Sequence, residues 1–187
     1  MKKLYDIIIV GCGIRGASFI AQNIDILKYN ILIIEESENI GVGKLPTYMV
    51  QSHSNCSNLL KYFKKKFFGN LDSSTLFKLN EPVNLTRVNN VLKLCGKKIE
   101  EFVGTNNILK LEKVISIEEE NDNIYILKTN KKQTIKGKII ILATGMTEKI
   151  NEELILFQHK VLLSGNLLSQ ENLIKNKEKL KQFDKKI

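Results

Sequence analysis

The 187-residue sequence contains few cysteines and few histidines. Its three cysteines, Cys12, Cys56 and Cys95, lie far apart, no C-x-x-C motif occurs, and the only histidines are His53 and His159. This set matches no zinc-ligand spacing and cannot form a disulfide framework. We therefore expect no metal site and a reducing, cytoplasmic environment.

The sequence also lacks a long apolar run. No stretch approaches the roughly 20 consecutive apolar residues that a membrane-spanning helix needs, so we expect no membrane partner. The first residues, MKKLYDIIIVGC, resemble a signal peptide superficially, but the apolar core is too short and Asp6 interrupts the approach to it. A buried strand that enters a glycine loop explains the same residues.

Arginine is scarce, although the chain is strongly basic. The formal charge is +9, yet only Arg15 and Arg87 among the 29 basic residues are arginines. Lysine, asparagine and isoleucine are all abundant, and all three have AT-rich codons. Genome composition explains this mixture better than selection for phosphate binding does, so a nucleic acid is not the partner that we favour.

The first part of the chain predicts a strand, a helix and a second strand. Residues 4–10 are short, β-branched and apolar, as in a parallel strand that is buried on both faces. Residues 14 to about 28 carry apolar side chains at helical spacing. The segment ILIIEE, residues 31–36, then predicts a second buried strand that ends in acid, which completes a βαβ unit.

The later part of the chain has a different pattern of predicted helices and short strands. Helices are predicted from about 55 to 68 and over 87–103, and residues 107–136 predict three short strands in a meander. The segment KIIILATGM, residues 138–146, predicts a buried strand that meets a tight turn. The predicted fold class is α/β, with a Rossmann-like parallel sheet and an inserted three-stranded β-meander.

A glycine motif joins the first strand to the first helix. VGCGIRGAS, residues 10–18, contains G-x-G-x-x-G at Gly11, Gly13 and Gly16. Gly11 permits a tight turn, Gly13 lets the backbone approach a pyrophosphate, and Gly16 lets the helix pack closely on the sheet. From Ile14 onward, the free N–H groups and the helix dipole favour a negative charge.

An acid ends the second predicted strand. Glu35 lies 19 residues after Gly16, where a carboxylate accepts hydrogen bonds from a ribose diol, and Glu36 is the alternative if the register differs by one residue. A carboxylate at this position disfavours a 2′-phosphate, so NADP is not expected here. The motif in this context predicts dinucleotide binding, and a glycine turn without a ligand is the alternative.

The order of elements after the second strand distinguishes between dinucleotides. A simple NAD dehydrogenase continues with further βα units, whereas here a loop, helices, a meander and a strand ending in Leu-Ala-Thr-Gly follow. From about Tyr5 to Met146, this order resembles the FAD-binding domain of the two-dinucleotide-binding-domain flavoproteins. These are FAD/NAD(P)-binding oxidoreductases that include the flavin monooxygenases.

The resemblance implies roles for particular residues. Gly11, Gly13, Ile14 and Gly16 would hold the FAD pyrophosphate, and Glu35 or Glu36 would hold the ribose. The backbone of Val114 would meet the adenine, and Thr144 and Gly145 would close over the cofactor. No catalytic residue is assigned, because the pattern around His53, SHSN, is more typical of a loop histidine than of an acid–base group.

No second G-x-G-x-x-G motif follows the first. We therefore expect an FAD-binding domain over 1–146, and a connector or tail over 147–187 that leads toward a missing NAD(P)H-binding half. The uncovered surface predicts a partner chain or a homo-oligomer.

Several functions remain open at this point. The first is an FAD-dependent, monooxygenase-like oxidoreductase that acts on a small-molecule substrate with NAD(P)H as co-substrate. The second is a non-catalytic FAD- or nucleotide-binding module, such as a truncated or split-enzyme subunit. The lysine bias argues against a third, a basic flavoprotein that acts on RNA. The sequence identifies neither the substrate nor the reductant.

Overall fold

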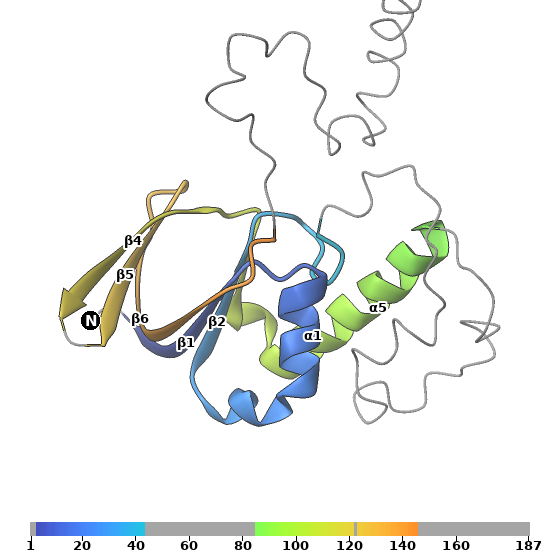
Figure 1. The fold of residues 1–187 in the computed structure, drawn as a ribbon, viewed down its shortest axis with the longest axis horizontal. Helices are drawn as coiled ribbons and strands as arrows, with labels where there is room; N and C mark the ends of the chain where they lie inside the picture. Colours follow the sequence, from blue (N-terminus) through green and yellow to red (C-terminus); the bar gives the residue numbers. More distant parts are fainter. Residues whose placement is uncertain (1–2, 44–84, 122, 146–187) are drawn as a thin grey trace, which may run out of the picture.

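The computed structural model describes residues 3–43, 85–121 and 123–145, and these form a six-stranded sheet with helices against it (Figure 1). The strand order is β3-β2-β1-β6-β5-β4. β1 pairs in parallel with β2 and β6, and β2 pairs in parallel with β3, whereas β5 is antiparallel to both β4 and β6. The strands are β1 (Leu4–Val10), β2 (Ile31–Glu35), β3 (Ile108–Lys110), β4 (Val114–Asn121), β5 (Ile124–Thr129) and β6 (Thr134–Leu142).

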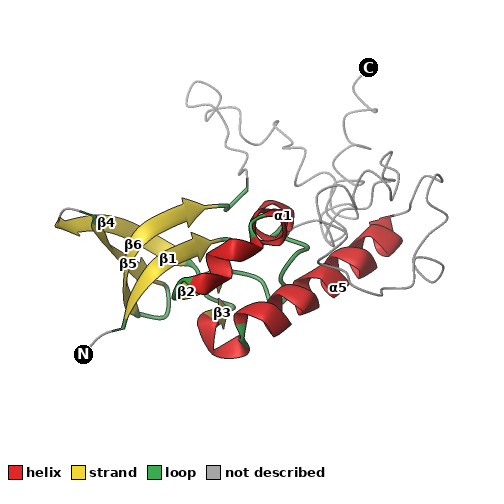
Figure 2. Cartoon of the chain, turned by 90° about the horizontal axis from the view of Figure 1, so that it is seen from below, coloured by secondary structure: helices red, strands yellow, loops and turns green. Residues whose placement is uncertain are grey.

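Two α-helices lie together on one side of the sheet (Figures 1 and 2). α1 (Ile14–Gln22) and α5 (Leu85–Val103) pack against alternate residues of β1 and β2 to form one hydrophobic cluster. The intervening residues of the same strands, such as Ile8 and Leu32, point to the other face and pack with Leu127 and Ile135 of the antiparallel strands. β1 and β2 are therefore covered on both faces, as their continuous apolar sequences predict.

The predicted α/β class and the βαβ unit at the start of the chain are confirmed. β1 has the predicted bounds, β2 ends one residue earlier than predicted, and α5 begins two residues earlier. The first helix is shorter than predicted, because α1 ends at Asn23 and a 3-10 helix, η1 (Ile24–Lys28), follows. The Asn23 side-chain amide donates to the Phe19 carbonyl at 2.9 Å, and the Asn23 backbone N–H donates to the same carbonyl at 3.0 Å, so Asn23 caps the end of the helix.

The inserted three-stranded meander is not confirmed in the predicted form. Its first predicted strand is divided into β3, which extends the parallel part of the sheet, and β4, with Leu111 between them at a φ of 54°. A short 3-10 helix, η3 (Thr105–Asn107), precedes β3. The third predicted meander strand and the predicted buried strand are one continuous element, β6, which pairs with β5 and β1.

β6 is less buried than its sequence predicts. Ile139 is 54% exposed and Leu142 is 65% exposed, although their partners Ile7 and Val10 in β1 are buried. The buried helix residues pack on β1 and β2, and only Ile141 of β6 is packed against that cluster. No helix in the described ranges is long and apolar enough to cross a membrane. The predicted helix over 55–68, His53, His159 and the tail over 147–187 lie outside the described residues.

Candidate functional site

The glycine loop lies where the carboxyl ends of three parallel strands meet (Figure 1). The Gly11 N–H donates to the Ile34 carbonyl at 2.8 Å, and the Ala143 N–H donates to the Val10 carbonyl at 2.8 Å. The loop is therefore fixed between the end of β2 and the end of β6. In open α/β sheets this edge is where ligands bind.

Two of the motif glycines permit close contacts that a side chain would prevent. Gly11 has a φ of +84°, and a Cβ there would lie 2.7 Å from the Ala143 oxygen and 2.9 Å from the Thr144 Cα. A Cβ on Gly16 would lie 2.5 Å from the Gly11 oxygen. These glycines bring the loop, the end of β6 and the start of α1 into direct backbone contact.

A second glycine loop covers the first, and sequence reasoning treated it only as loop punctuation. The Gly41 N–H donates to the Cys12 carbonyl at 2.7 Å, and a Cβ on Gly13 would lie 3.2 Å from the Gly43 Cα. α5 supports this loop, because a Cβ on Gly96 would lie 1.9 Å from the Ile40 oxygen. The sequence feature that indicates this second loop is the pair of glycines in Gly-Val-Gly, which begins six residues after Glu35.

The start of α1 is open to an anion. Gly13 is the N-cap and has no side chain to cap the helix, and the first turn contains no acid. The N–H groups of the first turn, at Ile14, Arg15 and Gly16, have no carbonyl one turn earlier within the helix. Together with the positive end of the helix dipole, they favour a phosphate group at this position.

Glu35 supports the loop from the end of β2. Its carboxylate is buried, and it accepts hydrogen bonds from the Cys12 N–H at 2.5 Å and from the Ser37 N–H at 2.8 Å. An ionised carboxylate offers about four acceptor positions, so capacity remains for hydroxyl donors. Glu36, the alternative acid, is instead exposed and pairs with Lys113 at 3.1 Å. Glu35 is thus the acid that contacts the loop.

The segment that leads to Val114 lies on the far side of β2. The Glu112 N–H donates to the Glu35 carbonyl at 3.1 Å, and the Leu111 N–H donates to the Ser37 carbonyl at 3.4 Å. Val114 then begins β4 and pairs with Thr129. The structure therefore brings the segment that ends at Val114 beside Glu35.

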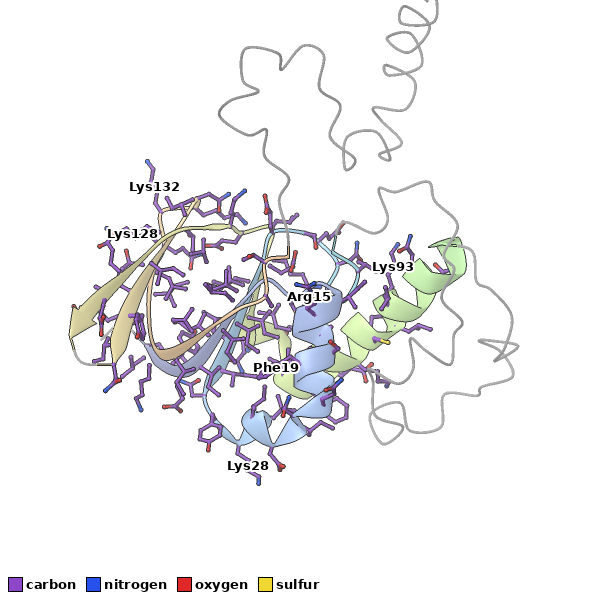
Figure 3. The ribbon with its side chains drawn as sticks, in the orientation of Figure 1. Arg15, Phe19, Lys28, Lys93, Lys128 and Lys132 are labelled. Atoms are coloured by element: carbon purple, nitrogen blue, oxygen red, sulfur yellow. The ribbon has the colours of Figure 1, made fainter. Side chains whose placement is uncertain are left out.

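Thr144 and Gly145 follow β6 and are exposed, with Gly145 at a φ of +77°. They border a shallow cavity of about 260 Å³, which the end of β6 shares with Arg15 and Phe19 of α1. Figure 3 shows Arg15 and Phe19 on α1, with Arg15 at the end next to the glycine loop. Sequence reasoning missed these two residues, although their spacing of four places them on one face of a helix.

Among the described residues, the first glycine loop contains no reactive thiol. Cys12 is fully buried, and burial, reinforced by the charge of Glu35, raises the pKa of its thiol far above the usual range. A thiol held in its neutral form is a poor nucleophile, so Cys12 acts here as a small apolar residue. Across residues 3–43, 85–121 and 123–145, no three histidine, cysteine or acidic side chains are grouped to hold a metal ion.

No family model matches the chain, and no curated protein matches it in sequence. Solved structures with a similar fold include "Oxidized steroid monooxygenase bound to NADP", 15% identical over 80% of this chain and 27% of that one, with a TM-score of 0.55. The "OTEMO complex with FAD and NADP" is 14% identical over 81% of this chain and 28% of that one, with a TM-score of 0.62.

A third similar structure is cyclohexanone monooxygenase from Rhodococcus sp. Phi1 bound to NADP⁺, 13% identical over 81% of this chain and 28% of that one, with a TM-score of 0.53. At these identities the likeness shows a shared fold. The chain spans less than a third of the length of these three structures.

Proposed function

We propose that this chain is an FAD-binding oxidoreductase domain of the flavin monooxygenase type, for which NAD(P)H supplies reducing equivalents. The observation that carries the proposal is the glycine loop with the Glu35 carboxylate hydrogen-bonded to it at 2.5 Å. An anion site at a helix start, next to a carboxylate with spare acceptor positions, suits a pyrophosphate joined to a ribose. When bound, FAD supplies the electron-transfer chemistry.

Particular residues would hold the two halves of the cofactor. The N–H groups of Ile14 and Arg15 would bind the pyrophosphate, with Gly11, Gly13 and Gly16 leaving room for the approach. Glu35 would accept the ribose hydroxyls, and Val114 would meet the adenine through its backbone. Thr144 and Gly145 would border the cofactor where β6 ends. The fold shared with the OTEMO complex with FAD and NADP supports this arrangement.

We place NADPH elsewhere, because the Glu35 carboxylate would repel its 2′-phosphate at this loop. We place the FAD-binding, Rossmann-like domain at 1–146 and a connector at 147–187, in a cytoplasmic protein. We also propose a partner chain or a second copy of this chain as a contact partner; the chain covers only 27–28% of three similar structures. The exposed Ile139 and Leu142 of β6 are apolar surface available for such contact.

The experiment is anaerobic mixing of the FAD-loaded protein with NADPH or NADH, followed through the absorbance of oxidised flavin. Loss of that absorbance with either nucleotide supports the oxidoreductase. FAD bound tightly but not reduced would instead support the second candidate, a non-catalytic FAD-binding module.

A further inference from the structure

A buried carboxylate outside the glycine loop joins three separate parts of the structure. Glu112 is 2% exposed, and its two oxygens accept hydrogen bonds from the Thr129 hydroxyl at 2.5 Å and the Gln133 amide at 3.2 Å. Its backbone N–H donates to the Glu35 carbonyl at 3.1 Å. Glu112 therefore links the end of β2 to the turn between β5 and β6.

The next residue is held to the same turn. The Lys113 N–H donates to the Asn130 side-chain oxygen at 2.9 Å, and the Asn130 N–H donates back to the Lys113 carbonyl at 2.9 Å. The turn is itself closed by the Thr129 N–H, which donates to the Gln133 carbonyl at 3.1 Å. Residues 112–113 are thus fixed on both sides.

The order of strands shows which part of a dinucleotide would reach this segment. The glycine loop follows β1, Glu35 ends the neighbouring β2, and the segment 111–114 follows β3 at the next position outward. With a pyrophosphate at the loop and a ribose on Glu35, the attached base continues in the same direction. It then lies beside the backbone of 112–114.

We infer that Glu112 is a positioning residue for the adenosine half of the dinucleotide, and that it acts by fixing the backbone of residues 112–114 beside Glu35. This inference rests on the proposed function, because it concerns the same site. Glu112 does not itself touch the ligand. Its carboxylate suits the task because each oxygen accepts from a different neutral donor of the turn between β5 and β6.

The pairing of Glu112 with Gln133 provides a matched set of variants. In Glu112→Gln an NH2 group replaces one of the two acceptor oxygens, so the Thr129 hydroxyl and the Gln133 amide can no longer both donate to residue 112. In Gln133→Glu two carboxylates meet. The double variant restores one donor and one acceptor with the roles exchanged. Glu118→Gln is the control, since Glu118 lies exposed in β4 and pairs with Lys128.

The experiment measures the dissociation constants of FAD and of ADP, the latter as a competitor of FAD, well below the melting temperature of each variant. We expect Glu112→Gln to weaken both ligands by about tenfold, with recovery in the double variant and no change in Glu118→Gln. Amide hydrogen exchange at residues 112–114 should slow when FAD binds to the wild type and not when it binds to Glu112→Gln.

The outcomes separate this inference from the proposed function. A folded Glu112→Gln protein that binds FAD and ADP with wild-type affinity overturns the inference and leaves the proposed function intact. Weakened FAD with unchanged ADP also overturns it. A wild-type protein that binds neither ligand overturns both. If Glu112→Gln does not fold, Thr129→Val with Thr129→Ser as control gives the same comparison, because only valine removes the hydroxyl donor.

Discussion

The carboxylate of Glu35 accepts a hydrogen bond of 2.5 Å from the backbone N–H of Cys12, in the middle of the glycine loop. This contact joins the acid at the end of β2 to the loop that follows β1, 23 residues earlier. The glycine loop is thereby fixed to the end of β2. Such preorganisation reduces the ordering that binding requires.

Replacing this acid should weaken both the loop and the binding of FAD. Glu35→Gln presents an N–H group to one of its two backbone donors, so we expect a loss of about 1–3 kcal/mol in the free energy of unfolding. FAD affinity should fall by at least about tenfold. Urea denaturation and fluorescence titration measure the two effects.

Glu36→Gln is the matched control, since Glu36 is exposed and pairs only with exposed Lys113 among the contacts that the structure describes. An exposed pair of this kind contributes little, so stability and FAD affinity should stay within experimental error of the wild type. An equal effect of both substitutions on FAD affinity would contradict the assignment of Glu35.

The second glycine loop should be as intolerant of side chains as the first. Gly41 has a φ of +94°, and a Cβ there would lie 2.4 Å from the Leu92 oxygen in α5. Gly104 also has a positive φ, of +82°, but a Cβ there meets nothing within 4 Å. We expect Gly41→Ala to destabilise the protein by about 1–3 kcal/mol more than Gly104→Ala does. Equal midpoints in thermal denaturation would contradict this packing.

The sequence predicts the first βαβ unit well because its signals are local. Residues 7–10 and 31–34 are apolar throughout, and glycines mark the turn between the first strand and α1. The end of α1 was missed because the Asn23 side chain caps the helix by donating to the Phe19 carbonyl, to which the Asn23 backbone N–H also donates. Such a contact does not alter the apolar pattern, which continues to Leu27.

The sheet beyond β2 was less predictable because it depends on distant contacts. Gly137 falls between two strands that were predicted separately, yet it lies inside β6, where a Cβ would come 2.5 Å from the Ile8 side chain. Leu111 divides the predicted long strand although leucine rarely adopts a positive φ. The role of Glu112 was also missed, since its partners Thr129 and Gln133 are distant in the sequence.

Both described cysteines should be unreactive in the folded protein. Burial raises the pKa of the Cys95 thiol to about 12, and burial and Glu35 raise that of Cys12 further. Because the thiolate is the reactive form, iodoacetamide at mildly alkaline pH should label neither residue until the protein is denatured. Peptide mass spectrometry gives the labelling of each site. Rapid labelling of native Cys12 would contradict the buried loop.

The stability of the sheet should decrease in acid through Asp6. Hydrogen bonds from the Lys138 ammonium at 2.7 Å and from the Asn30 N–H at 3.1 Å lower the pKa of Asp6 below its usual value. A lowered folded-state pKa stabilises the protein above the unfolded pKa, and this stabilisation is lost as pH falls through the folded value.

The test is urea denaturation from neutral to strongly acidic pH. Asp6→Asn and Lys138→Met should each reduce the loss of stability in acid, and the double variant should add little. An acid profile that neither substitution changes would show that Asp6 does not contribute to it.

The absorption spectrum of the purified protein, with identification of the nucleotide that heat releases, tests the central claim most directly. We expect a yellow protein that releases FAD in near-equal amount, and a Glu35→Gln variant that holds much less. A folded, colourless protein that cannot be reconstituted with FAD would contradict the proposal that this chain binds FAD. The Glu36→Gln control would then be equally well folded and equally colourless.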